Sequence, residues 1–144
     1  MKSAVIFPTV SDVLGLHSDQ IREFGGAAGI RDQGLLESAV AQASTTYDGE
    51  YLHNGLFEMA AAYAFHIAEN QPFLDGNKRT GLNAAIVFLG LNGFDVVDDE
   101  GALYEAMIGL STGEWSKGQM AALLERLSER WKDDIQLYAA ELTP

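Results

Sequence analysis

The strongest constraint on the fold is a pair of apolar segments with helical spacing, which flank a short polar loop. The second segment, about residues 77–92, carries apolar side chains at i, i+3, i+4 and i+7, and it stops at Asn92-Gly93. The members of this stripe are Leu82, Ala85, Ile86 and Leu89. The first segment, about residues 56–70, has to end near Gln71, because Pro72 disfavours the α conformation in the residue before it. We therefore predict two helices that hold the loop at both of its ends.

Two further helices are predicted before this pair. Thr9 followed by Asp12 offers side-chain oxygens to the free amides of a first turn, and Asp32 can cap a second helix in the same way. The inner face of the helix that follows Thr9 is expected to carry Val10, Val13, Leu14, Ile21 and Phe24. Residues 44–54 are predicted to form an exposed loop or a short hairpin, with Asp48-Gly49 at the turn.

The pattern after the central pair is again helical. Helices are predicted over about 99–110 and about 116–127, the latter with a Ser116/Gln119 capping box. The acidic run Asp95–Glu100 is expected to be a solvated helix entry. A last amphipathic stretch is indicated by Trp131, Ile135, Tyr138 and Leu142. The predicted fold class is all-α.

Length and composition exclude several classes of protein. The 144 residues suffice for one domain, 1–144, and 47% hydrophobic residues argue against disorder. The formal net charge of −12 argues against direct nucleic-acid binding, since such a surface repels phosphate backbones. The absence of cysteine excludes disulfides and thiolate metal sites. No apolar run approaches the roughly 18 residues of a membrane span, and the start lacks the features of a secretory signal, so we expect a cytoplasmic protein.

The polar loop and the helix start after it, residues 71–80, concentrate the chemistry of the chain. Two of the nine basic residues, Lys78 and Arg79, stand side by side at the start of a predicted helix. Free backbone amides and the helix dipole already favour an anion there. Lysine adds a point charge, and arginine adds a planar fork that suits phosphate oxygens. Gly76 allows a close approach of the backbone to a ligand.

Two more side chains fit a phosphate site. Asn77 can cap the helix or direct an amide donor at a phosphate, and Asp75 is a hard oxygen ligand suited to a magnesium ion shared with phosphates. The same residues are also common in turns, and the spacing alone leaves that alternative open. There is no Gly-x-x-x-x-Gly-Lys-Ser/Thr run, so this is not a P-loop. We predict a cradle for nucleotide phosphates with a metal-binding carboxylate.

The segment from Gln71 to Thr80 resembles the signature of the Fic/Doc superfamily, roughly His-x-Phe-x-Asp/Glu-Gly/Ala-Asn-Gly/Lys-Arg. The lysine before the arginine is similar to the death-on-curing (Doc) branch, the toxins of toxin–antitoxin pairs. A second stretch, residues 24–38, also resembles the N-terminal region of Doc-type proteins. The resemblance covers about residues 3–128.

The resemblance implies a bundle of about six to seven helices with a short loop or hairpin flap. It implies a protein Ser/Thr kinase-type enzyme that uses ATP and Mg²⁺ to phosphorylate a hydroxyl of a translation factor similar to elongation factor Tu. Most other Fic proteins transfer AMP. The family's metal ligand corresponds to Asp75, its anion-binding turn to Gly76 and Asn77, its phosphate clamps to Lys78 and Arg79, and its buried loop aromatic to Phe73.

One position departs from the motif. The family histidine, which is understood to take the proton from the attacking hydroxyl, corresponds to Gln71. An amide does not titrate near neutral pH, so it can only bind and orient that hydroxyl. Three explanations stay open: a deliberate His→Gln change, a naturally binding-only member, or an active enzyme that relies on positioning and charge. We expect weak or no activity.

Several other residues have both a functional and a structural interpretation. Residues 44–54 correspond to the flap over the site, so Tyr47 and Tyr51 are candidates for contact with the target, and solvated loop tyrosines are the alternative. Arg31 is a candidate for a nucleotide or target contact, and a salt bridge at the helix cap is the alternative.

The three histidines give no zinc site, because their spacing is not clustered. His66 lies five residues before Gln71 in a predicted helix, an offset of about 140° that directs it away from the loop. We therefore expect His66 to be a packed or hydrogen-bonded structural residue, and His17 and His53 to be exposed.

The sequence contains no inhibitory Ser/Thr-x-x-x-Glu-Gly/Asn helix of the kind that restrains many Fic proteins. The segment from Thr46 to Glu50 is the closest match to this motif, but Tyr51 stands where the motif requires Gly or Asn. A separate antitoxin protein is therefore the expected partner, with a segment that folds into a groove of this domain. Our first hypothesis is a Doc-type toxin. The alternatives are a catalytically silent module that binds nucleotide or antitoxin, and an AMP-transferase, against which Lys78 argues.

Overall fold

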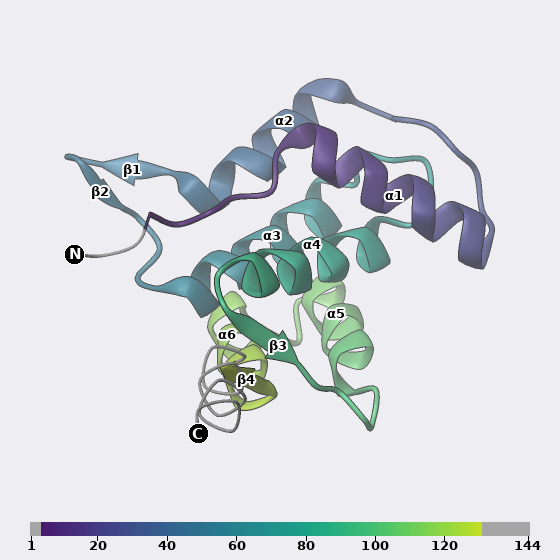
Figure 1. The fold of residues 1–144 in the computed structure, drawn as a ribbon. Coiled ribbons are helices and arrows are strands. Elements are labelled where there is room, and N and C mark those ends of the chain that lie inside the picture. Colours follow the sequence, from purple (N-terminus) through teal and green to yellow (C-terminus); the bar gives the residue numbers. More distant parts are fainter. Residues whose placement is uncertain (1–3, 131–144) are drawn as a thin grey trace, which may run out of the picture.

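Helices α3 (Leu56–Asn70) and α4 (Asn77–Leu91) lie side by side at the centre of the fold (Figure 1). The computed structural model describes residues 4–130. Small side chains let the two helices approach: a Cβ on Gly81 would lie 2.8 Å from the carbonyl oxygen of Ala64. The predicted bounds of both helices are confirmed to within a residue, and α3 ends where Pro72 required it to end.

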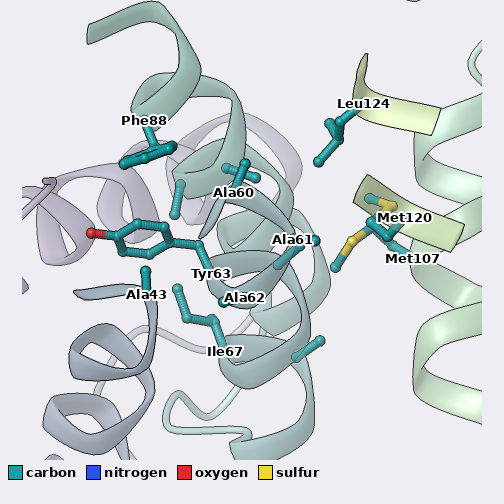
Figure 2. Packing of buried hydrophobic residues seen from close by; sticks show 14 of the residues in the cluster. Ala43, Ala60, Ala61, Ala62, Tyr63, Ile67, Phe88, Met107, Met120 and Leu124 are labelled. Carbon is teal, nitrogen blue, oxygen red and sulfur yellow. The ribbon is translucent and has the colours of Figure 1, made fainter. Parts of the chain in front are cut away.

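The core is built around α3. Figure 2 shows Tyr63 beside Phe88 of α4, with their ring centroids 5.5 Å apart, and Met107, Met120 and Leu124 gathered on another side of the helix. The methionines and the leucine come from α5 (Ala102–Thr112) and α6 (Lys117–Arg126). The Tyr63 hydroxyl is buried but donates a hydrogen bond to the carbonyl oxygen of Pro8, 3.0 Å away. α3 is thus covered on several sides.

Helices α1 (Val10–Phe24) and α2 (Gln33–Ala41) precede this core and begin as predicted. Thr9 and Asp12 form a reciprocal capping box, and Asp32 accepts a hydrogen bond from the amide of Leu35. The inner face of α1 was predicted in part wrongly, because Phe24 is 55% exposed. It belongs to the last turn of α1, beyond the core, where its ring lies against Arg79.

The hairpin predicted within residues 44–54 is confirmed. A short 3₁₀ helix, η1 (Gln42–Ser44), leads into β1 (Thr46–Tyr47), which pairs antiparallel with β2 (Glu50–Tyr51). Asp48 and Gly49 both have positive φ, at 54° and 81°, as a tight two-residue hairpin turn requires.

A second strand pair was not predicted. β3 (Phe94–Val96) pairs antiparallel with β4 (Ser128–Arg130). The acidic run is therefore only in part a helix entry: Asp95 lies in β3, whereas the Asp98 carboxylate accepts hydrogen bonds from the first amides of α5, which begins at Ala102.

The rest of the predicted order holds. The Ser116/Gln119 capping box starts α6, and the predominantly helical fold class is confirmed. The amphipathic stretch predicted from Trp131 onward lies outside the described residues. None of the helices within residues 4–130 combines the length and apolar character that crossing a bilayer requires.

Candidate functional site

The loop between α3 and α4 is held by the segment that follows α1. The amides of Arg31 and Asp32 both donate to the carbonyl oxygen of Pro72, at 2.6 and 3.0 Å, and the amide of Leu74 donates to Gly29. Ile30 and Phe73 form an isolated antiparallel bridge. The two stretches that the sequence analysis singled out are therefore neighbours in the structure.

Phe73 and Asn77 set the shape of the loop from inside. Phe73 is 1% exposed, which confirms the expected buried aromatic. The Asn77 side chain accepts from the Phe73 amide and donates to the Phe73 carbonyl oxygen, both at 3.0 Å. The side chain was expected to cap the helix or to contact an anion, but both of its functional groups are used within the loop. The N-cap of α4 is Gly76, with φ 78° and no side-chain cap.

Asp75 lies at the exposed tip of the loop and is fixed through both its side chain and its backbone. Its Oδ2 accepts a hydrogen bond from the amide of Ala27 at 2.7 Å. Its carbonyl oxygen lies 2.8 Å from Nε2 of His17. The expectation that His17 is exposed is wrong: it is 5% exposed, because α1 packs this side chain under the loop. Sequence reasoning missed this contact, since a lone histidine carries no local signal of it.

The two cations stand at the start of α4 without carboxylate partners. Lys78 and Arg79 are half-buried, and within residues 4–130 neither lies within salt-bridge distance of an acidic side chain. The Arg79 guanidinium lies 4.3 Å from the ring centroid of Phe24 and 4.8 Å from that of Tyr104. Aromatic faces attract the cation without neutralising it. The positive charge at this helix start is therefore available to an anion.

A polar cavity opens over these groups. It has a volume of about 270 Å³ and is lined by Gln71, Leu74, Asp75, Gly76, Asn77, Lys78, Arg79 and Tyr104. A second cavity of about 270 Å³ is lined by Gln20, Ile21, Phe24, Gly25, Gly26, Asp75, Gly76 and Arg79. The two cavities share Asp75, Gly76 and Arg79, so the start of α4 borders both of them. The structure thus brings together all six residues from the predicted loop site. Tyr104 was missed, because nothing in the local pattern of α5 marks it.

Gln71 occupies a constrained position at the edge of the first cavity. It is the C-cap of α3 in the left-handed region, with φ 47°, which is uncommon for a residue other than glycine. Arg31 supports this turn: its Nε donates to the carbonyl oxygen of Gln71 and its Nη2 to that of Asn70. Among residues 4–130 Arg31 forms no salt bridge at the helix cap, and it is not among the residues that line the two cavities. Its contact with a nucleotide or target stays a prediction.

The hairpin does not cover the cavity. Tyr47 is 79% exposed, and the ring of Tyr51 lies 5.6 Å from Phe7, which in turn lies 5.5 Å from Phe88 near the far end of α4. The hairpin precedes α3 and the loop follows it, so the two are separated by a helix about 22 Å long (Figure 1). The expectation that Tyr47 and Tyr51 lie over the site is therefore wrong.

His66 and His53 lie away from the loop. Nε2 of His66 is 3.2 Å from Nζ of Lys117, which confirms a hydrogen-bonded structural residue. Burial, aided by the charge of Lys117, lowers the pKa of His66 to about 4. His53 was expected to be exposed, but it is half-buried and its Nε2 has no partner among the described residues.

The chain belongs to the Fic/DOC family. The sequence model of that family matches residues 7–89, from before α1 to near the end of α4, and so confirms the resemblance read from the loop. The chain is 35% identical over 116 residues to the protein kinase doc of Escherichia phage P1, a match that covers 81% of this chain and 90% of that protein. It is 42% identical over 76 residues to the toxin Doc of Mycolicibacterium smegmatis, covering 53% of this chain and 58% of that protein.

Proposed function

We propose that this chain is a Doc-type toxin of a toxin–antitoxin pair, whose loop binds ATP with Mg²⁺ and presents the terminal phosphate to a hydroxyl of a translation factor. The observation that carries the proposal is the convergence on one polar cavity of Lys78 and Arg79, which have no acidic partner among residues 4–130, with the uncapped start of α4 and the Asp75 carboxylate. Free amides and cations at a helix start suit phosphate oxygens. The name of the phage relative, a protein kinase, supports transfer of phosphate.

The Asp75 carboxylate fits a magnesium ion whose other ligands are phosphate oxygens of the nucleotide and water. The Asp75 carboxylate is exposed, and its Oδ1 accepts no hydrogen bond from any residue between 4 and 130. The same part of the chain contains no group of three or more His, Cys, Asp or Glu residues that could hold a metal. One carboxylate together with phosphate oxygens and water is a usual arrangement for Mg²⁺. When bound, the ion neutralises charge on the phosphate oxygens.

Gln71 limits the proposed chemistry. In the transfer, the hydroxyl oxygen bonds to the terminal phosphorus, the bond from that phosphorus to its bridging oxygen breaks, ADP leaves, and the hydroxyl proton has to go to a base. The amide of Gln71, at the cavity edge, can accept a hydrogen bond from that hydroxyl but cannot take its proton. Loss of a general base costs about 10²–10⁴ in rate. We therefore propose that this chain binds nucleotide and turns it over slowly.

Two other functions remain candidates, each on a specific observation. Gln71 favours a silent module that binds nucleotide or antitoxin without turnover. The second cavity bordered by Asp75 and Gly76 offers room for the rest of a nucleotide in an orientation that suits AMP transfer, against which Lys78 argues. A separate antitoxin is proposed as the partner, because the segment closest to an inhibitory motif, Thr46–Glu50, forms the β1–β2 hairpin and no helix.

Labelled ATP separates these functions. The chain and its Gln71→His variant are incubated with Mg²⁺, cell extract, and ATP labelled at either the γ or the α phosphate. We expect γ label on one protein band, stronger by about 10²–10⁴ with the histidine variant. A Gln71→His/Asp75→Asn double variant serves as the control and should transfer no label to any protein band. Label from the α position would show AMP transfer, and no label from either protein would show a binding module.

A further inference from the structure

We propose that His17 is a positioning residue of the nucleotide site, whose Nε2–H and ring fix the Asp75–Gly76 turn before a ligand arrives. The consequence for ligand binding rests on the proposed function, whereas the effect on the turn does not. His17 lies on α1, 58 positions before Asp75, and none of the roles assigned so far uses it.

The imidazole is held on three sides by the loop. Its Nε2 lies 2.8 Å from the carbonyl oxygen of Asp75. Its ring stacks on Phe73, with the centroids 3.7 Å apart and the planes 5° from parallel. A Cβ placed on Gly76 would lie 3.7 Å from both Cδ2 and Nε2 of His17. His17 therefore contacts the buried Phe73 and the backbone of Asp75, the proposed metal ligand, and it lies close beside the left-handed Gly76.

The hydrogen bond to the Asp75 carbonyl oxygen shows that Nε2 of His17 acts as a donor. A backbone carbonyl oxygen can only accept a hydrogen bond, so Nε2 of His17 has to carry a hydrogen. A purely apolar residue at this buried position could stack on Phe73 but would leave the Asp75 carbonyl without this donor. The identity of residue 17 thus matters for the direction in which the peptide group between Asp75 and Gly76 points.

That peptide group precedes a glycine, so no side chain of residue 76 restricts its orientation. Gly76 has φ 78° and no side chain to restrict it, and it is followed directly by the uncapped amides of α4. The amide of Ala27 holds the Asp75 carboxylate, and His17 holds the Asp75 carbonyl. With both groups fixed, the carboxylate and the amides keep one relative orientation, which lowers the cost of ordering them around a ligand.

Two substitutions separate the hydrogen bond from the packing. His17→Phe keeps a flat ring against Phe73 and removes the donor, whereas His17→Gln removes the ring and keeps an N–H at a similar distance from the backbone. Val13→Ala is the matched control, because Val13 is buried on the same helix but is not among the residues that line either cavity. The probe is a non-hydrolysable ATP analogue with Mg²⁺, titrated by calorimetry into each full-length protein.

We expect His17→Phe to weaken binding of the analogue by about tenfold, His17→Gln to recover most of that loss, and Val13→Ala to bind like the parent although it unfolds more easily. Binding by His17→Phe within about threefold of the parent would overturn the proposal. An equal loss in Val13→Ala at comparable stability would overturn it as well, since the effect would then be general destabilisation.

A second measurement does not depend on nucleotide binding. Long-range ¹H–¹⁵N spectra should show a hydrogen on Nε2 of His17, and the amide signals of Gly76, Asn77 and Lys78 should move in His17→Phe but not in Val13→Ala. A parent protein that fails to bind the analogue would contradict the proposed function only. Unmoved loop signals, or an unprotonated Nε2, would refute the role of His17 whatever the affinity.

Discussion

The Nε atom of Arg31 lies 2.6 Å from the carbonyl oxygen of Gln71, so the segment between α1 and α2 is hydrogen-bonded to the end of α3. The same guanidinium donates to the carbonyl oxygen of Asn70 at 2.7 Å. These are the last carbonyl groups of the helix, which have no partner within the helix itself. Arg31 thus stabilises the left-handed turn from which Gln71 reaches the cavity.

The first prediction concerns this contact. Arg31→Ala removes two charge-assisted hydrogen bonds and should lower the free energy of unfolding by about 1–3 kcal/mol, measured by urea denaturation. Arg22→Ala is the control. Arg22 is an exposed arginine of α1 that pairs only with Asp19 in the described part of the chain, and its loss should cost less than about 0.5 kcal/mol. Equal effects of the two changes would show that Arg31 does not support the turn.

The second prediction concerns the aromatic rings beside Arg79. Tyr104→Ala should weaken binding of the Mg²⁺–ATP analogue by roughly threefold to tenfold. The Arg79 guanidinium then loses one of the two aromatic rings that orient it. Tyr104→Phe keeps the face and should bind like the parent in the same titration. A comparable loss in both variants would indicate that the hydroxyl acts on the ligand and that the ring does not.

The third prediction tests the packing that places the loop. Gly81→Ala puts a methyl group 2.8 Å from the Ala64 carbonyl oxygen, and it should destabilise the protein by about 1–3 kcal/mol as α3 and α4 move apart. Gly90→Ala on the same helix meets no atom within 4 Å and should be neutral or stabilise by up to about 1 kcal/mol. Thermal unfolding of both variants measures this contrast. If Gly81→Ala were as stable as Gly90→Ala, the close approach of the helices would be refuted.

The fourth prediction concerns pH. The pKa of His66 is lowered from 6.5 to about 4 in the folded protein, mainly by burial. Between these two values the unfolded chain binds a proton that the folded chain does not, so stability falls as the pH is lowered from about 6.5 towards 4. His66→Gln removes this contribution. The urea midpoint of the parent should therefore fall relative to that of the variant as the pH is lowered, and a constant difference across this range would contradict the assignment.

Local patterns were sufficient for most of the helices and for the loop. The spacing in residues 56–70, the proline at position 72 and the capping boxes at Thr9 and Ser116 act within a few residues, and each was located from the sequence. The loop residues from Asp75 to Arg79 were found in the same way, because a helix start with adjacent cations is a local feature.

Long-range contacts were not accessible to this reasoning. The pairing of Phe94 with Arg130 joins segments more than 30 positions apart, and neither three-residue strand has a pattern long enough to predict it. The burial of His17 depends on how α1 docks under the loop. The position of the Tyr47 hairpin depends on the length of α3, which separates it from the site. Each of these errors concerns where elements meet, whereas the type of element was usually right.

Calorimetric titration of the unmodified chain with a non-hydrolysable ATP analogue and Mg²⁺ tests the central claim most directly. We predict saturable binding at one site that requires the ion. The Lys78→Glu/Arg79→Glu double variant should weaken it by at least about tenfold, because both charge-assisted contacts to phosphate are reversed. A chain that showed no binding of the analogue, or bound it equally well after the charge reversal, would contradict the assignment of this loop as a nucleotide-phosphate site.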